Sequence, residues 1–343
     1  MKNNFVVIMA GGFGERFWPK SSEKKPKQFL DLNNCGSTLI KQTYDRFKKI
    51  CKKNNIYVAT HEKYKKLVLE NINEINEENI ILEPEKKNTS PCILLSTFII
   101  NKINKNSNVL FTPADHHIGN KDDFNRDIKK CFDFIDNNKG ILTIGIKPTY
   151  PATGYGYIKT NKKTKDKFYD IDEFVEKPKI KKATIFLKDK KYYWNAGIFV
   201  SKTETIINEF KKNGQHNYKV LCKVKDFDLK TIKKEYKKMK SISFDYEILE
   251  KCKLIYMLKC DFNWSDLGSW SSVSKFMKED NNKNKTNSKR IKTFNSKNNI
   301  INIDQKNELI VEGINNYIII QHKNKILICK KKNEQKIKNF LKD

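Results

Sequence analysis

The 343-residue chain contains few arginines, and this scarcity limits the kinds of partner it can have. Its formal charge of +29 would suggest a nucleic acid or an anionic membrane surface as partner. Nearly all of that charge is lysine, with arginine only at Arg16, Arg46, Arg126 and Arg290. Nucleic-acid readers rely on arginine forks interleaved with aromatic side chains, and no such patch occurs here. We therefore expect no specific nucleic-acid partner, and we attribute the excess of lysine and asparagine to compositional bias.

Long apolar runs and paired cysteines are also missing. A membrane-spanning helix takes about 20 apolar residues, and the stretch CILLSTFII (92–100) is among the longest present. The apolar run Phe5–Ala10 is shorter than the core of a signal peptide. The eight cysteines include no CxxC pair and no Cys/His cluster at zinc spacing, which is typical of reduced thiols. We expect a soluble, cytoplasmic protein with no membrane partner.

Short apolar runs alternate with segments that have helical periodicity. The runs predict buried strands: FVVIMA (5–10), NIYVAT (55–60), IILEP (80–84), VLFTPAD (109–115) and ILTIGI (141–146). Between them, apolar residues recur at helical spacing, as at Leu39, Tyr44, Phe47 and Ile50. This alternation predicts an α/β fold with a mostly parallel mixed sheet. In such sheets ligands bind beyond the carboxyl ends of the strands, so the loops there should form the site.

The chain changes character near residue 280. The segment DNNKNKTNSK (280–289) has no apolar residue, which predicts an exposed linker. Short apolar runs then follow at close intervals and predict a small all-β module with a lysine-rich helical tail. We expect a main domain over 1–280, a polar linker over 281–292 and the β module over 293–343.

A glycine-rich loop, MAGGFGERFWP (9–19), follows the first predicted strand. Glycines there let backbone N–H groups approach a phosphate, and a following helix N-terminus adds a favourable dipole. Arg16 and Lys27 would neutralise the charge of that phosphate. An ordinary tight turn is the alternative, because the motif is neither GxGxxG nor a P-loop.

The glycine loop and KPKQF (25–29) together resemble the signature of bacterial mannose-1-phosphate guanylyltransferases, members of the sugar nucleotidyltransferase superfamily. Phe17 stands where that family usually has leucine. The resemblance covers essentially the whole chain and continues, in the family's order, through EPEKKNTSP (83–91), TPADHHI (112–118), TGYGYI (153–158), FVEKP (174–178), WNAGIF (194–199) and NWSDLGSW (263–270).

The resemblance implies a glycosyltransferase-A-like, Rossmann-like fold with a small C-terminal β-helix. It implies that GTP and mannose 1-phosphate form GDP-mannose and diphosphate, by direct metal-assisted attack of the sugar phosphate on the α-phosphate. No Ser, Cys or His nucleophile is needed, because the attacking phosphate is already anionic. Many relatives carry a phosphomannose isomerase domain after the transferase, and this chain ends too early for one, so we expect a monofunctional enzyme. The oligomeric state stays open, with a homodimer among the alternatives.

The resemblance also assigns site residues. Arg16 and Lys27 would bind the triphosphate, and Asp115 and Asp266 would hold Mg²⁺ against it, so these four are the expected catalytic residues. The residues expected to bind the nucleotide are Ala10, Gly11, Gly12, Gly14, Asn88, Thr89, Pro113 and Ala114. The residues expected to bind the sugar phosphate are Gly154, Glu176, Lys177, Asn195 and Asp245.

Each assignment has a structural alternative. Asp115 and Asp245 would serve equally as helix N-caps, and Asp266 as a turn residue. Glu176 and Lys177 would form a solvated charge pair at a strand end. The adjacent histidines at 116 and 117 cannot both face one metal in regular structure, so we do not expect them to be ligands.

Three rival functions stay open at this point. One is another hexose-1-phosphate nucleotidylyltransferase with a different sugar or base. A second is a non-catalytic, sugar-nucleotide-sensing subunit, which the intact catalytic set argues against. The third is a nucleic-acid-binding protein, which would show steep salt dependence.

Overall fold

The chain forms two compact units, each assembled from segments that lie far apart in the sequence. The structure is a computed structural model and describes residues 3–224 and 227–341. Unit 1 comprises Met1–Gly11, Thr43–Ala114 and Ile118–Trp264. Unit 2 comprises Gly12–Gln42, Asp115–His117 and Ser265–Asp343.

Unit 1 is built on a nine-stranded sheet. Its strands are β1 (Asn4–Met9), β2 (Ile56–His61), β3 (Ile80–Glu83), β4 (Asn108–Pro113), β6 (Ile141–Ile146), β7 (Tyr157–Lys165), β8 (Phe168–Val175), β9 (Tyr192–Lys202) and β10 (Ile255–Cys260), in the order β3-β2-β1-β4-β9-β6-β10-β8-β7. Only β8 and β9 run against the others. The sheet is therefore mixed and mostly parallel, as predicted, and the five predicted strands are confirmed as β1, β2, β3, β4 and β6.

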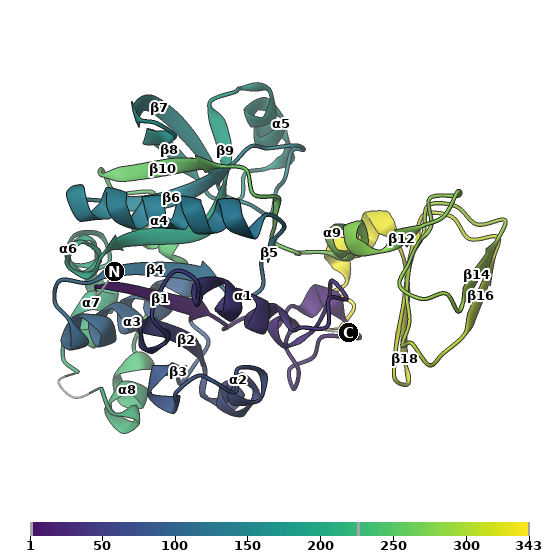
Figure 1. Ribbon diagram of the computed structural model, residues 1–343, viewed down its shortest axis with the longest axis horizontal. Helices are drawn as coiled ribbons and strands as arrows, with labels where there is room; N and C mark the ends of the chain where they lie inside the picture. The colour runs from purple at the N-terminus through teal and green to yellow at the C-terminus, as the bar shows by residue number, and fades with distance from the viewer. Residues whose placement is uncertain (1–2, 225–226, 342–343) are drawn as a thin grey trace. The chain divides into compact units, whose positions relative to one another are not determined.

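Helices cover both faces of this sheet. They are α1 (Leu39–Phe47), whose residues are divided between the two units, and α2 (Lys65–Asn71), α3 (Thr89–Ile103), α4 (Lys121–Asn137), α5 (Ile180–Lys188), α6 (Thr203–Asn213), α7 (Gln215–Leu221) and α8 (Leu229–Tyr236). Four consecutive buried residues, 5–8 on β1, require cover on both faces, because successive side chains point to opposite sides. Residues of α3, α6, α7 and α8 share one core cluster with Phe5 and Val7 of β1. In Figure 1, α4 crosses the near side of the sheet.

Short elements complete unit 1. They are the 3-10 turns η3 (Lys53–Asn55), η4 (Glu62–Tyr64) and η5 (Glu77–Asn79), and the π-helical turn η6 (Asp245–Leu249). The two-residue strands β5 (His117–Ile118) and β11 (Trp264–Ser265) lie where the chain passes from one unit to the other. No helix among the described residues is both long and apolar enough to cross a bilayer.

Unit 2 contains a β-helix-like module. Its strands are β12 (Lys278–Glu279), β13 (Lys285–Thr286), β14 (Ile291–Phe294), β15 (Ile300–Asn302), β16 (Leu309–Glu312), β17 (Tyr317–His322) and β18 (Lys325–Lys330). β13, β15 and β17 stack in parallel, as do β14 and β16, so successive coils lie on one another. Their inward side chains form an apolar core of Ile301, Ile303, Val311 and Ile319.

The segment 281–292, expected to be a polar linker, belongs to this module and contains β13 and the start of β14. Asparagine side chains explain how so polar a sequence is ordered. Asn284 is fully buried and accepts hydrogen bonds from the backbone and side-chain nitrogens of Asn299, at 3.0 and 2.9 Å. Asn299 in turn accepts from the Tyr317 backbone N–H at 2.9 Å. Stacked asparagine amides thus bond one coil to the next. These asparagines have a structural role, which the attribution of the asparagine excess to compositional bias did not predict.

An apolar cluster joins the module to the segment 12–42. Phe17 packs edge-on against Trp270, with 5.3 Å between ring centroids, and both are fully buried. Leu32 and Leu39 join them with Ile318 of β17. The remaining elements of unit 2 are η1 (Glu15–Phe17), η2 (Lys27–Phe29), α9 (Trp270–Val273), η7 (Ser274–Phe276) and η8 (Lys331–Lys336). Unit 2 thus holds the glycine loop from Gly12 onward and the expected catalytic residues together with the module.

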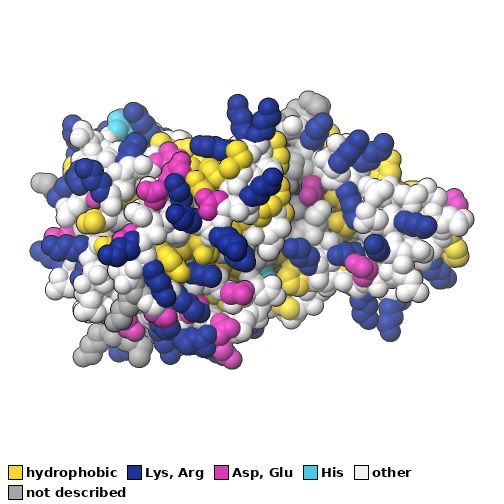
Figure 2. Space-filling view, turned by 90° about the horizontal axis from the view of Figure 1, so that it is seen from above, with side chains coloured by type: hydrophobic (Ala, Val, Ile, Leu, Met, Phe, Trp, Pro, Cys, Tyr) yellow, Lys and Arg dark blue, Asp and Glu magenta, His cyan; other side chains and the backbone are white. Residues whose placement is uncertain are grey.

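Positive charge is spread over the surface. Figure 2 shows lysine and arginine side chains scattered over the face in view, with acidic side chains among them. Many lysines pair with carboxylates, such as Lys48 with Glu74 and Lys65 with Glu77. The scatter fits solvated charge better than a nucleic-acid groove.

Candidate active site

The glycine loop starts at the carboxyl end of β1. The Ala10 N–H donates to the Ala59 carbonyl at 2.7 Å, and the Ala10 carbonyl accepts from the Thr60 hydroxyl at 2.9 Å. A Cβ added at Gly11 would lie 3.6 Å from the Glu83 carboxylate, which is ordinary contact. The loop therefore leaves the sheet from a firmly held residue, as expected for a site at the strand ends.

Gly14 is the position in this loop that requires glycine. Its φ of 70° lies in the left-handed region, and an added Cβ would stand 2.5 Å from the Cβ of Lys27. The Lys27 N–H donates to the Phe13 carbonyl at 3.1 Å. The loop and the segment that carries Lys27 thus lie against each other, backbone to backbone.

Lys27 is the centre of a cluster within unit 2. Its side chain is 5% exposed, and its ammonium donates to Asp115 Oδ2 and to the Asp266 carbonyl, both at 2.8 Å. The lysine thus links two segments that are 88 and 239 residues away along the chain. Burial disfavours the charged form of Asp115, but the charges of Lys27 and His116 outweigh it, so its pKa is lowered. Asp115 is therefore ionised at neutral pH.

Asp266 lies in a tight turn that depends on a second glycine. Its Oδ1 accepts from the Gly268 N–H at 2.9 Å, and a Cβ at Gly268 would collide with Oδ2 at 2.3 Å. The Gly268 carbonyl faces Arg16, whose terminal nitrogen is 3.5 Å away. Arg16 Nε is buried without a hydrogen-bond partner in the part of the chain that the structure describes. The structure therefore brings all four expected catalytic residues into unit 2.

A second cluster, in unit 1, contains the residues expected to bind the sugar phosphate. Asn195 Nδ2 donates to Asp245 Oδ1 at 3.0 Å. Glu176 pairs with the neighbouring Lys177. Burial, and then the charge of Glu176, raise the pKa of Asp245. The structure thus brings Glu176, Lys177, Asn195 and Asp245 together. Gly154 is not packed against them, because a Cβ added there would meet no atom within 4 Å.

The residues expected to contact the base also lie in unit 1. Asn88 has a φ of 67°, and its side chain accepts from the Thr89 N–H at the start of α3. The Thr89 hydroxyl accepts from the Phe244 N–H at 2.9 Å, next to Asp245. Pro113 ends β4 beside Met9 of β1, and the Ala114 N–H donates to the Met9 carbonyl at 3.0 Å. These loops emerge at the carboxyl ends of β3 and β4, parallel strands that β2 and β1 separate in the sheet.

Comparison with known proteins identifies the family. The family described as nucleotidyl transferase matches residues 5–283. The chain belongs to the nucleotidyl transferase family. A mannose-1-phosphate guanylyltransferase of Salmonella typhimurium is 35% identical over 288 residues, which cover 81% of this chain and 60% of that protein. One from Escherichia coli is 34% identical over 292 residues, covering 81% and 62%.

The structural match of this nucleotidyl transferase to a known protein covers more of the chain than the sequence matches do. A crystal structure from Thermus thermophilus, described as a mannose-1-phosphate geranyltransferase, matches with a TM-score of 0.89. The match covers 99% of this chain and 98% of the other at 24% identity, so it bears on the fold alone. This chain spans about 60% of the length of the curated relatives named above.

Sequence reasoning missed Thr143 and Gly156, which the transferase fold places beside the expected residues. The Thr143 hydroxyl, on β6, donates to Asn195 Oδ1 at 2.8 Å and so orients its amide. A Cβ at Gly156 would lie 2.7 Å from Glu176 Oε2. The sequence did contain an indication of Thr143, because its hydroxyl is the one polar side chain in the apolar run ILTIGI. The role of Gly156 had no signal of its own, because it depends on the approach of another strand.

Glu83, at the end of β3, was also missed, and it leads to a prediction about pH. Its side chain is buried, and its carboxylate accepts from the Tyr236 hydroxyl at 2.5 Å. Burial raises the pKa of Glu83 to about 7, although hydrogen bonds from Tyr236 and Cys92 oppose the shift. Because the folded pKa is the higher one, protonation stabilises the fold, and this contribution is lost as the pH rises from about 4.5 through 7.

Replacing Glu83 with glutamine should therefore stabilise the transferase at pH 8 by roughly 2 kcal/mol and change little at pH 5. Urea denaturation of both proteins at the two pH values measures the difference. Glu78→Gln, at an exposed position in the same segment, is the matched control and should show no such pH dependence. An equal effect of Glu83→Gln at pH 5 and pH 8 would show that Glu83 is ionised in the folded protein at both.

The left-handed backbone of Gly14 gives a second prediction. Gly14→Ala should lower the unfolding free energy by about 1–3 kcal/mol, because it combines an unfavourable φ with a clash against Lys27. Gly12→Ala is the matched control, since a Cβ at Gly12 would meet no atom within 4 Å. Urea denaturation of the two variants compares them directly. Equal stability would mean that the loop rearranges freely around Gly14.

Proposed function

We propose that this chain is a mannose-1-phosphate guanylyltransferase, joining GTP and mannose 1-phosphate into GDP-mannose and diphosphate. The observation that carries the proposal is the Lys27 ammonium, held 2.8 Å from both Asp115 Oδ2 and the Asp266 carbonyl. A buried ammonium held between a carboxylate and a backbone carbonyl suits a reaction whose main difficulty is phosphate charge. Guanine and mannose come from the names of the relatives, and the geometry supports the phosphate chemistry.

In the proposed reaction, an oxygen of the sugar phosphate attacks the α-phosphorus of GTP. The bond from that phosphorus to the oxygen of the β-phosphate breaks, and diphosphate leaves with the electron pair. Lys27 and Arg16 neutralise charge as it moves toward the leaving group, and the Arg16 Nε, unpartnered among the described residues, provides a donor for a phosphate oxygen. Positioning and charge stabilisation supply most of the rate enhancement in reactions of this type.

We further propose Mg²⁺ as the metal, held by Asp115 and Asp266. Divalent metals are common in this family, and carboxylate oxygens suit a hard cation. The described residues contain no group of three or more His, Cys, Asp or Glu side chains placed for a metal. Two carboxylates fit Mg²⁺ nonetheless, because it usually keeps waters and takes further oxygens from substrate phosphates. Bound there, the ion would supply positive charge to the triphosphate.

The residues outside the proposed catalytic set have roles suited to the substrates in the proposed reaction. Glu176, Asn195 and Asp245 would bond sugar hydroxyls, with Gly154 leaving room for the ring, and Lys177 would meet the sugar phosphate. Asn88, Thr89, Pro113 and Ala114 would contact guanine, and the backbone of Ala10, Gly11, Gly12 and Gly14 the nucleotide phosphates. We place the protein in the cytoplasm, which fits its free cysteines.

Release of diphosphate by the purified protein tests the proposal. GTP, ATP, UTP and dTTP are each combined with mannose 1-phosphate or glucose 1-phosphate in the presence of Mg²⁺. We expect release only with GTP and mannose 1-phosphate. Turnover of another pair would replace the substrates but keep the chemistry. Folded protein that binds GTP and releases nothing in any mixture would favour the sensing role instead.

A further inference from the structure

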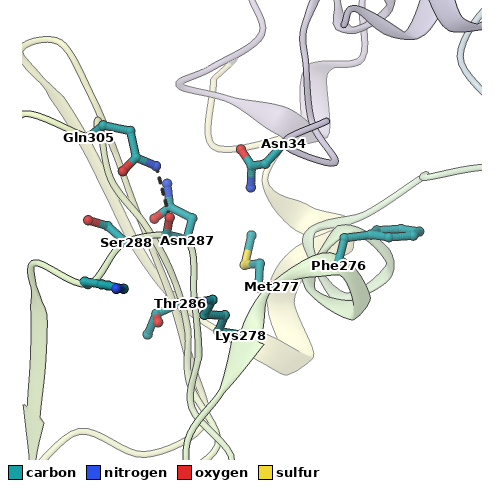
Figure 3. A pocket seen from close by; sticks show the side chains of 9 residues that line it. Asn34, Phe276, Met277, Lys278, Thr286, Asn287, Ser288 and Gln305 are labelled. Atoms are coloured by element: carbon teal, nitrogen blue, oxygen red, sulfur yellow. Dashed lines mark hydrogen bonds between the residues drawn. The ribbon is translucent and has the colours of Figure 1, made fainter. Parts of the chain in front are cut away.

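A cavity of about 270 Å³ lies within unit 2, apart from the residues proposed for the reaction. Asn34, from the loop before α1, forms one side of it, and Asn287 and Gln305 of the β module form the other. Figure 3 shows these amides on opposite sides of the cavity, with Met277 reaching toward Asn34 between them. A water takes about 30 Å³ of liquid volume, so the cavity has room for a molecule the size of roughly nine waters.

The side chains that line the cavity suit an anion that carries hydroxyl groups. Lys278 and Lys289 supply positive charge, and Thr286 and Ser288 supply hydroxyls beside the amides. Among the described residues, no Asp or Glu lines the cavity. The nearby carboxylate of Glu279 is paired with Lys285 at 3.4 Å, which leaves the two lysines of the cavity to a ligand. Lysine meets phosphate as a point charge. Both polar atoms of the Asn287 amide bond the Ile303 backbone, at 2.7 and 2.9 Å, so the amides of Asn34 and Gln305 are the ones that can bond hydroxyl groups of a ligand, as donor or as acceptor.

The cavity also adjoins the three segments that carry the proposed catalytic residues. Asn34 follows η2, where Lys27 lies, and Phe276 ends η7, ten residues beyond Asp266. The Phe276 ring points away from the amides in Figure 3 and packs on His117, with 4.3 Å between ring centroids. His117 is two residues from Asp115. A ligand that moves Phe276 would therefore act on the backbone next to the Lys27–Asp115 pair.

We propose that this cavity binds a small phosphorylated polyol of the hexose-phosphate class, and that its occupancy changes turnover through Phe276 and His117. Binding is independent of the proposed function, whereas the effect on turnover rests on it. The lysines take the phosphate, and the amides and hydroxyls take the polyol. The ligand acts as an effector, because the cavity shares no residue with the proposed substrate sites.

Calorimetric titration of the purified protein with glucose 6-phosphate tests the binding. This probe has no phosphate on its anomeric carbon, so it cannot react as a substrate. We expect it to bind, glucose not to bind, and the affinity to fall roughly tenfold or more in the Lys278→Gln/Lys289→Gln double variant. Lys297→Gln, an exposed lysine of the same module outside the cavity, is the matched control and should bind as the parent does.

Two results would overturn the binding proposal. Unchanged affinity in the double variant would place the ligand elsewhere, for instance in the sugar-phosphate site. Inorganic phosphate binding as tightly as glucose 6-phosphate would remove the polyol from the assignment. Neither result depends on turnover, so a failure here is distinct from a failure of the proposed function.

The effect on turnover is tested with Phe276→Leu. We expect glucose 6-phosphate to change the rate of the parent protein by about fivefold. The variant should still bind the probe but lose most of this response. His117→Gln changes the other side of the same ring contact and should also bind the probe but lose most of the response. It replaces Phe276→Leu in this test if that variant folds poorly. A full response in both variants, or none in the parent protein, would contradict the coupling.

Discussion

Lys27→Ala is expected to lower the rate of diphosphate release by about 10²–10³-fold, the effect of removing one pre-organised charge from an electrostatic site. The ammonium is nearly buried and joins Asp115 to the backbone of Asp266, so no water or neighbouring lysine can replace it in that geometry. The loss should fall on kcat more than on KM, since the charge acts mainly on the leaving diphosphate. Steady-state kinetics with GTP and mannose 1-phosphate separates the two constants.

Lys27→Ala should also lower the free energy of unfolding, but this effect should be smaller than the effect on the rate. Removing Lys27 leaves Asp115 without its partner, but because 31% of the Asp115 side chain is exposed, the cost is smaller than for a fully buried charge. Lys25→Ala, an exposed lysine two residues earlier, is the matched control and should keep full activity. A Lys27→Ala protein that is active once folded would remove Lys27 from the mechanism.

Asp115→Asn should also lower turnover by about 10²–10³-fold, and it should change the response to Mg²⁺. The asparagine is isosteric and can still accept from Lys27, but it carries no charge for a cation. The lowered pKa of Asp115 means that the parent protein keeps this charge at neutral pH. Diphosphate release measured against Mg²⁺ concentration should show that the variant needs far more of the ion.

Asp122→Asn is the matched control for this variant, because Asp122 is an exposed carboxylate at the start of α4. The Lys27→Ala/Asp115→Asn double variant adds a further check. Residues in direct contact that act as one unit have non-additive effects, so the double variant should be little worse than either single one. An unchanged Mg²⁺ response in Asp115→Asn would assign the metal to other ligands.

Local patterns in the sequence were sufficient to predict the strands. The runs that became β1, β4 and β6 are apolar on both faces, and such runs are stable only as buried strands between helices. The module strands β15 to β18 were likewise readable from short runs separated by polar turns. The division of the chain into two units could not be predicted from local patterns, because unit 2 depends on contacts such as that of Phe17 with Trp270, which lie far apart in the sequence.

The asparagine-rich segment shows where local reasoning fails. A stretch without apolar residues normally indicates a linker, since it has nothing to bury. Here Asn284 is buried because its side chain replaces backbone partners, bonding to Asn299 of the next coil. That partner exists only after the coils have stacked, so the sequence on either side of Asn284 holds no sign of it.

The α/β architecture and the glycine loop at the end of the first strand follow from the sequence alone, and so do the residue types that we expect at a phosphate site. These depend on periodicity and spacing over a few residues. The folded structure was needed to show that Lys27 joins Asp115 to Asp266, that Gly14 must be glycine to admit Lys27, and that a basic cavity adjoins their segments. Such contacts join residues far apart in the chain, and they form only when burial of the apolar clusters offsets the entropy of closing the intervening loops.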